Sequence, residues 1–473
     1  MWRSVYWGQA ETVESRRGAD LITRCSDAAD RNHRAPNPMD KVLFKYYMDP
    51  TTWVYVSSLM TIGIYFKFRR FWSVRNFDLI GLILFAPGLL LVASHEERLG
   101  YLWLTAVAAA YLVRLLIDPV MVRRPLLEPN LSVDGLTFTG IALLVFLVGN
   151  VVTTQLTESD QVGAERMDKI LAREITPDEL HKEPQPIPGY PLFHVFATFS
   201  NTALVPDAQA VPLPRRALVR AVATRGSVIL GHLGIVIGIV LIGYRHFDNL
   251  HSGMAVAALY LLLPYTSQMT SRVDHVVPAA MLVWAVEAYR RPAVAGLFLG
   301  LACGLICYPL FLLPLWCGFY WQRGLGRFMA GVVVALLFLA LTLIYVSSDA
   351  ASFLGYVRTM FGGKAWTVPT SAGFWIHHEP IYRIPVVVAF VSGCLALALW
   401  PPQKNLGTLL SCSAAIMLGV TFWYDPGTGV YHMAWFVPLL LLTVFRPNLE
   451  DRIALVAVKP SRYLQRRAAA QSG

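Results

Sequence analysis

Residues 292–321 read PAVAGLFLGLACGLICYPLFLLPLWCGFYW and contain no charged side chain. A helix of about 20 residues crosses the hydrocarbon core of a bilayer, so this run is too long for one comfortable span. Basic residues bracket it, with Arg291 directly before it and Arg323 shortly after. Pro309 lies near its middle, where a proline removes a backbone donor and breaks a helix. We predict two short helices that fold back at Tyr308-Pro309; one long, tilted and kinked helix is the alternative.

Similar apolar runs recur along nearly the whole chain. Of its 473 residues, 55% are hydrophobic and 15% are charged, a balance that water-soluble proteins of this length do not show. Apolar runs of about 15–23 residues must be helical in lipid, because a helix satisfies its own backbone groups. We therefore predict an all-α polytopic membrane protein of about 13 transmembrane helices, some short or broken. The predicted spans lie near 51–66, 78–94, 100–121, 135–156, 226–244, 253–269, 275–289, 292–306, 308–321, 325–347, 384–400, 406–423 and 429–445.

Basic turns between these spans give the predicted orientation. They fall on one side of the membrane, at Lys67, Arg69, Arg70, Arg75, Arg123, Arg124, Arg290, Arg291, Arg323, Arg327 and Lys404. By the positive-inside rule this side is the cytoplasm, and the basic tail 446–473 agrees with it. The other face, periplasmic or lumenal, then receives a long loop at 157–225. Four arginines at the end of that loop conflict with the rule, but long loops follow it poorly.

The remaining composition narrows the class of protein. Residues 1–45 form a polar tail that we expect to be disordered; it has no signal-peptide core, and Met39 is an alternative start to Met1. The formal charge of +10 is spread over short loops rather than one soluble face, so we expect no nucleic-acid partner. The six cysteines lack metal-ligand spacing. No GxxxxGK[ST] loop occurs, and we expect no cofactor.

Two carboxylates directly follow the fourth predicted span, Glu158 and Asp160. A carboxylate at the boundary between membrane and water is able to accept a proton from an incoming hydroxyl group. The alternative is that both are ordinary solvated loop acids. They are the candidate catalytic residues of the outer face.

Arg272, Asp274 and His275 form a second outer cluster at the start of an apolar run. The forked guanidinium of an arginine is suited to phosphate. The alternative is an internal Arg272–Asp274 pair at the start of a helix, which needs no ligand. His432, at the outer mouth of the last two spans, is a further candidate, against the alternative of a hydrogen-bonded interfacial residue.

The third outer cluster is His377, His378 and Glu379, which lie beside aromatic residues. A His-His-Glu run suggests zinc, but adjacent histidines on a helix point about 100° apart, which is poor ligation geometry. We predict a loop that lines a substrate site and no metal site.

The order of these features resembles the GT-C-fold integral-membrane glycosyltransferases, in particular bacterial polyprenyl-phosphate-mannose-dependent α-mannosyltransferases. The segments that carry the resemblance are the acidic start of the long outer loop, VDHVVPAAMLVWAVEAYRRPAVAGLFLGLACGLICYPLFLLPLW (273–316) and YHMAWFVPLLLL (431–442). It covers 135–445 as a GT-C-like core and leaves 46–134 as an accessory three-helix module. Many relatives have a Lys or Gln beside the broken-helix proline, where this chain has Cys307 and Tyr308.

The resemblance implies transfer of a sugar, for example mannose, from a polyprenyl-phosphate donor to a lipid or glycan acceptor. The reaction would take place on the outer face of a bacterial inner membrane, with the C-terminus in the cytoplasm. Asp160 would be the general base, or Glu158 if the register differs. Arg272, Asp274 and His275 would lie near the donor phosphate or sugar, with Tyr308 and His432 beside the cavity. A multi-span transporter and a non-catalytic subunit of envelope polysaccharide assembly are the alternatives.

Overall fold

Most helices of this protein begin and end close to the predicted spans. The computed structural model describes residues 50–94, 96–121, 128–153, 165, 167, 169–170, 190–192, 213–268, 272–321, 323–361, 374–402, 404–424 and 432–447. They belong to one unit, Pro50–Gly473. These ranges contain helices and turns and no β-strand, so the all-α prediction is confirmed for the part described. The predicted tail 1–45 and nearly all of the tail 446–473 lie outside the described residues.

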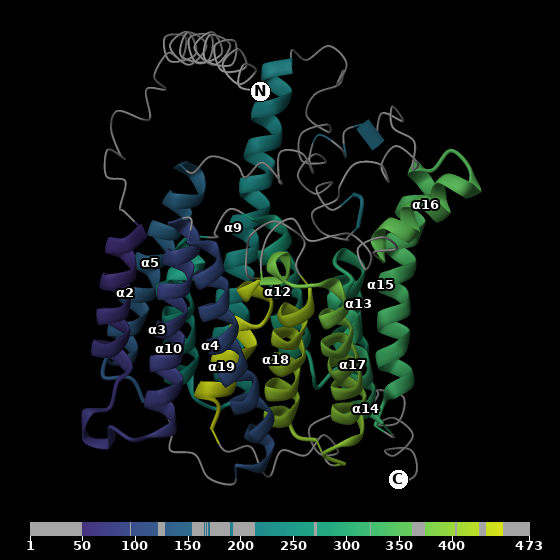
Figure 1. Cartoon of the computed structure of the whole chain (residues 1–473). Helices are drawn as coiled ribbons and strands as arrows, with labels where there is room; N and C mark the ends of the chain where they lie inside the picture. The colour runs from purple at the N-terminus through teal and green to yellow at the C-terminus, as the bar shows by residue number, and fades with distance from the viewer. Residues whose placement is uncertain are drawn as a thin grey trace, which may run out of the picture. The chain divides into compact units, whose positions relative to one another are not determined.

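Among the described residues, six helices are long and apolar enough to cross a membrane (Figure 1). They are α3 (Val74–Ala93), α4 (Glu97–Ile117, extended to Val120 by a 3-10 turn), α5 (Val133–Thr153), the Thr224–His246 part of α9 (Leu213–His246), α15 (Leu325–Val346) and α18 (Leu406–Trp423). Shorter helices fill the other predicted spans: α2 (Pro50–Tyr65), α10 (Leu250–Leu262), α11 (Pro264–Gln268), α12 (Val273–Glu287), α13 (Pro292–Leu305), α14 (Leu313–Tyr320), α17 (Arg383–Leu399) and α19 (Val437–Phe445). The count of about 13 spans stays a prediction.

The long outer loop predicted at 157–225 differs from the structure at its C-terminal end. Residues 213–225 are helical and continue directly into the apolar part of α9. Their sequence, LPRRALVRAVATR, is rich in Ala, Leu and Arg, which are strong helix formers. The helical propensity of residues 213–225 therefore explains why α9 begins before the apolar run from which its span was predicted.

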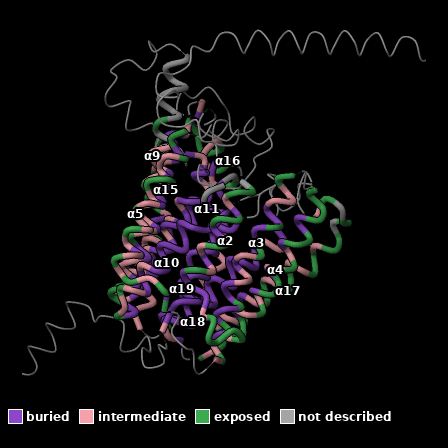
Figure 2. The backbone as a smooth tube through the Cα atoms, turned by 90° about the vertical axis from the view of Figure 1, so that its left-hand side faces the viewer, coloured by how far each residue is buried: buried purple, intermediate pink, exposed green. Residues whose placement is uncertain are grey.

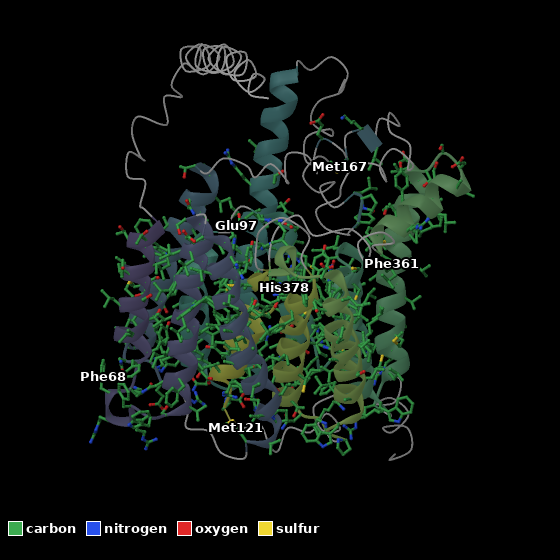
Figure 3. All side chains as sticks on the ribbon, viewed as in Figure 1. Phe68, Glu97, Met121, Met167, Phe361 and His378 are labelled. Carbon is green, nitrogen blue, oxygen red and sulfur yellow. The ribbon has the colours of Figure 1, made fainter. Side chains whose placement is uncertain are left out.

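Successive helices run in opposite directions, which gives the bundle two chemically different ends. Figure 3 shows Phe68 and Met121 at one end and Glu97 and His378 at the other. The predicted basic turns that the structure describes lie at the end of Phe68, which we call the basic end; the other is the opposite end. Arg123 and Arg124 lie outside the described residues. Lys404, one of those basic residues, is only 3% exposed and donates to the carbonyls of Ala398 and Pro401, at 2.9 Å each. The orientation of the two ends in a membrane stays a prediction.

The long apolar run 292–321 forms two short helices, as predicted. α13 ends at Leu305, Ile306 is extended, and a 3-10 turn, η5 (Tyr308–Leu312), leads into α14. The Tyr320 hydroxyl donates to the carbonyl of Tyr289 over 2.7 Å, so both ends of the run lie together at the basic end. The chain therefore folds back at Tyr308-Pro309.

Glycines allow some of these helices to touch backbone to backbone. A Cβ at Gly296 of α13 would lie 2.0 Å from the carbonyl oxygen of Phe328 in α15. A Cβ at Gly331 of α15 would lie 2.1 Å from the carbonyl oxygen of Ala293. No side chain fits at these distances, and such close crossings are typical of helix packing in membranes.

The buried core runs along the helices that carry the C-terminal part of the chain. Figure 2 shows buried residues concentrated along α10, α18 and α19, whereas the outer helices are exposed over part of their surface. The three helices of the predicted accessory module pack directly on this core. Tyr65 of α2 donates to the carbonyl of Ala255 over 2.9 Å, and Phe85 of α3 lies 6.2 Å from Phe436, ring centre to ring centre. The division of the chain at residue 135 stays a prediction.

Candidate functional site

Five of the predicted site residues, from three separate parts of the chain, lie together at the opposite end of the bundle. Arg272, Asp274 and His275 begin α12, Tyr308 begins η5, and His432 precedes the 3-10 turn η8 (Met433–Trp435). With Tyr265 of α11 and Trp435 of η8 they form what we call the histidine cluster. It is almost completely enclosed: Arg272 is 3% exposed, His275 0% and His432 2%.

Arg272 and Asp274 form an ion pair at the start of α12. Two parallel bonds join them, Nε to Oδ1 at 3.2 Å and Nη2 to Oδ2 at 2.7 Å. Arg272 occupies the N-cap position, and the carboxylate in the first turn is stabilised by the helix dipole. This is the internal pair that the sequence left as an alternative. Because the carboxylate already occupies the guanidinium fork, phosphate binding by Arg272 would require the pair to open, and it stays a prediction.

A chain of hydrogen bonds connects three side chains behind this pair. The Tyr265 hydroxyl lies 2.6 Å from Nδ1 of His275, and Nε2 of His275 lies 2.9 Å from Nδ1 of His432. The nearest carboxylate oxygen of Asp274 is 3.8 Å from His275 Nε2, too far for a hydrogen bond. The histidines are therefore bonded to each other and to the tyrosine rather than to the acid.

Aromatic rings fix the position of His432. Its imidazole lies flat on the indole of Trp435, with centres 4.4 Å apart and planes 7° apart. The ring of Tyr308 also stacks on Trp435, with centres 5.1 Å apart, and contacts Tyr424 at 4.2 Å between ring centres. Trp435 Nε1 in turn donates to the carbonyl of Asp274 over 3.3 Å. Tyr308 thus belongs to the wall of the cluster, next to the broken helix that supplies it.

Sequence reasoning missed Tyr265 and Trp435. Both are buried aromatic residues within apolar runs, where an aromatic side chain is usually core. The available signal was proximity, because Trp435 follows His432 by three positions and Tyr265 precedes His275 by ten. Buried Tyr and Trp usually need a partner for their polar atom, which is what the cluster provides.

The predicted substrate-lining residues 377–379 lie at the same end but outside the histidine cluster. His377 ends the 3-10 turn η6 (Phe374–His377), and His378 and Glu379 connect it to the 3-10 turn η7 (Pro380–Tyr382). His378 and Glu379 are exposed, and His378 Nδ1 lies 3.0 Å from the carbonyl of Phe374; the side chain of His377 is not among those described. Trp375 donates to the carbonyl of Phe422 over 2.8 Å and holds this segment on the end of α18.

Glu158 and Asp160, the candidate catalytic acids, lie outside the described residues. Within the ranges that the structure describes, no group of three or more His, Cys, Asp or Glu side chains is arranged to hold a metal ion. As possible metal ligands, the histidine cluster contains two imidazoles and one carboxylate, and the carboxylate is already paired with an arginine.

A second buried polar cluster, which the sequence analysis did not predict, lies at the basic end. Asp78 of α3 accepts two bonds from Arg114 of α4, at 2.9 and 3.0 Å. Arg114 also donates to Asp118 over 2.8 Å, and Arg446, just after α19, donates to the other oxygen of Asp118 over 2.6 Å. We call these four residues the ionic cluster. All four carboxylate oxygens are bonded, while Nε of Arg446 has no partner among the described residues.

Comparisons with family models, with curated proteins and with solved structures give no match to this chain. Its function is therefore inferred from the geometry of the two clusters.

Proposed function

We propose that this chain is a membrane glycosyltransferase that moves a sugar, for example mannose, from a polyprenyl-phosphate donor to a lipid or glycan acceptor. The supporting observation is the histidine cluster, in which ionisable groups from α11, α12 and η8 are buried together at one end of apolar helices. Such groups are costly at the edge of a membrane and tend to be retained for function. The broken helix at Tyr308 provides one wall of the cluster, at the place where the glycosyltransferase resemblance expects it.

The proposed roles follow from the position of each group. Asp160, or Glu158, accepts the proton of the acceptor hydroxyl, a step that contributes about 10²–10⁴-fold to a rate. The histidine cluster contacts the phosphate or sugar of the donor, and residues 377–379 line the approach to it. The basic end and the C-terminus lie in the cytoplasm of a bacterial cell, and the histidine cluster lies at the outer face of the inner membrane. The reaction needs neither a nucleotide nor a metal cofactor.

A multi-span transporter is the second candidate, and the ionic cluster favours it. Ionisable residues inside membrane helices often mark the pathways of ions and substrates. Asp78, Arg114 and Asp118 are such residues, and they join α3 and α4 to the C-terminal end of α19 through Arg446. A transporter would move a substrate without changing its covalent structure, which separates the two proposals experimentally.

The test is a transfer assay on the full chain in nanodiscs. Radiolabelled polyprenyl-phosphate sugars are offered with a lipid extract to wild type, to Asp160→Ala and to Asp349→Ala, an acid at the same end of the bundle that serves as control. We expect new labelled product with wild type and the control, and a loss of about 10²–10⁴-fold with Asp160→Ala. If folded wild-type protein transfers no sugar from any donor, the transporter or a non-catalytic assembly subunit is the better explanation.

A further inference from the structure

One nitrogen in the histidine cluster is buried and has no hydrogen-bond partner. Nε2 of His432 is enclosed, yet none of the described residues bonds to it. A buried polar atom without a partner costs about 1–3 kcal/mol, and native proteins contain few of them. The imidazole is held rigidly, because Trp435 covers its face and His275 bonds its other nitrogen. This atom therefore needs an explanation that the protein's own contacts do not supply.

The hydrogen-bond chain indicates whether this nitrogen is a donor or an acceptor. A neutral imidazole has one N–H and one lone pair, so the bonds along Tyr265, His275 and His432 all point in the same direction. If Tyr265 donates to His275 Nδ1, then His275 Nε2 donates to His432 Nδ1, and His432 Nε2 carries a hydrogen. In the reverse direction His275 donates to Tyr265, and the tyrosine hydrogen needs a further acceptor. Each arrangement leaves one hydrogen without a partner in this hydrogen-bond chain: that of His432 Nε2–H in the first and that of the Tyr265 hydroxyl in the second. An acceptor beside His432 Nε2 would select the first arrangement, in which this nitrogen is a donor.

We propose that His432 Nε2–H donates a hydrogen bond to a phosphate oxygen of a bound polyprenyl phosphate. This inference deepens the proposed function and rests on it for the identity of the lipid. The partner of an N–H must be an acceptor, and a bond to an anionic oxygen is about twice as strong as a neutral one. The sequence favours Arg272 for the phosphate contact, but the guanidinium of that residue is held by Asp274. The free donor of the cluster is His432.

The charges around His432 permit an anion at this place. Three neighbours are neutral, Tyr265, Tyr308 and Tyr424, and they come from α11, η5 and the end of α18. The two charged groups, Arg272 and Asp274, both come from α12 and are paired with each other. An arriving phosphate therefore meets a balanced pair rather than an unpaired carboxylate.

The experiment measures binding rather than sugar transfer. Farnesyl phosphate is titrated by calorimetry into the full chain in detergent, for wild type, His432→Phe and His432→Gln. Phenylalanine keeps the ring on Trp435 and removes the donor, whereas the glutamine amide restores an N–H near the position of Nε2. We expect His432→Phe to bind farnesyl phosphate about tenfold to hundredfold more weakly, and His432→Gln to recover most of the affinity.

Two further ligands, farnesol and inorganic phosphate, serve as controls. Farnesol tests whether His432→Phe disturbs packing around the lipid chain, and inorganic phosphate tests whether the site binds free phosphate. Farnesol, which lacks the phosphate, should bind wild type and His432→Phe equally, and inorganic phosphate should bind far more weakly than farnesyl phosphate. The inference is overturned if His432→Phe binds farnesyl phosphate as well as wild type does, if it loses farnesol to the same extent, or if wild type does not distinguish the two lipids. Inorganic phosphate that binds as tightly as farnesyl phosphate would instead identify a site for free phosphate. If the protein binds the lipid phosphate through His432 but transfers no sugar, the proposed enzymatic activity is wrong. The hydrogen bond from His432 to phosphate is then still supported.

Discussion

The ionic cluster and the histidine cluster lie at opposite ends of the same bundle. They differ in how their buried polar groups are paired. In the ionic cluster two arginines and two aspartates alternate, so each charge has an opposite charge beside it. The bond from Arg446 to Asp118 joins residues that are 328 positions apart in the chain. The histidine cluster contains one ion pair and a chain of groups that ends in an unbonded nitrogen. Every carboxylate oxygen of the ionic cluster thus has a partner, whereas the histidine cluster keeps one nitrogen to which none of the described residues bonds.

The largest effect that we predict is the loss of Asp118. This carboxylate is fully buried and accepts bonds from both arginines. Asp118→Ala removes the carboxylate that Arg446 bonds and one of the two carboxylates that Arg114 bonds, which should lower the free energy of unfolding by about 3–5 kcal/mol. Thermal unfolding of the purified protein in detergent measures this. Asp134→Ala, an exposed acid in the first turn of α5, is the control and should change stability by less than about 0.5 kcal/mol. Equal melting temperatures for the two variants would show that the cluster does not hold the helices.

A double substitution tests whether the two ends of the ionic cluster act together. Asp118→Leu and Arg446→Met each remove one partner of the same bond. Made together they remove the charge on both sides, so the double variant should be less destabilised than the sum of the single variants. We expect a coupling of about 0.5–3 kcal/mol from unfolding of all four proteins. Strict additivity would mean that Arg446 does not stabilise Asp118.

The contrast between the clusters also explains what the sequence was able to predict. Apolar runs located most of the helices to within a few residues, the starts of α9 and α19 excepted, and the proline at 309 located the break in the run 292–321. Alternation between the two ends was enough to place His275 and His432 on one face, though not to show that they touch. The ionic cluster was missed because Asp78 and Asp118 each resemble an ordinary acid near the end of a span. Which arginines pair with these acids depends on how the helices pack. Neither the periodicity nor the spacing of the sequence shows that Arg446 contacts Asp118.

A smaller effect is expected in the histidine cluster. Tyr265→Phe removes the hydroxyl that lies 2.6 Å from His275 Nδ1 and leaves that nitrogen buried without its partner. The free energy of unfolding should fall by about 1–3 kcal/mol, less than for Asp118→Ala, because no unpaired charge is created. Tyr244→Phe is the matched control, since the ring of Tyr244 is exposed in α9. A loss as large as that of Asp118→Ala would show that the histidine cluster is also a stabilising element.

The smallest effect concerns an acid outside both clusters, at the start of α16 (Ala350–Met360). Asp349 accepts a bond from the backbone N–H of Ser352 over 2.7 Å, and bonds from the Ser352 hydroxyl and amide lower the pKa of this carboxyl below its ordinary value of 3.8. A lowered pKa in the folded state means that the cap stabilises the helix above pH 3.8 and is lost as the pH falls through the folded value.

Hydrogen exchange of the amides at Ser352 and Phe353 measures this cap directly. With intrinsic exchange rates corrected for pH, wild type should be better protected than Asp349→Ala at about pH 5.5, where the carboxylate is charged. The difference between the two proteins should shrink as the pH falls below 3.8, because the protonated acid caps poorly. Neither ion pairing nor burial contributes at this exposed position. A difference that persists unchanged into strong acid would therefore show that packing of α16, and not its cap, determines the protection.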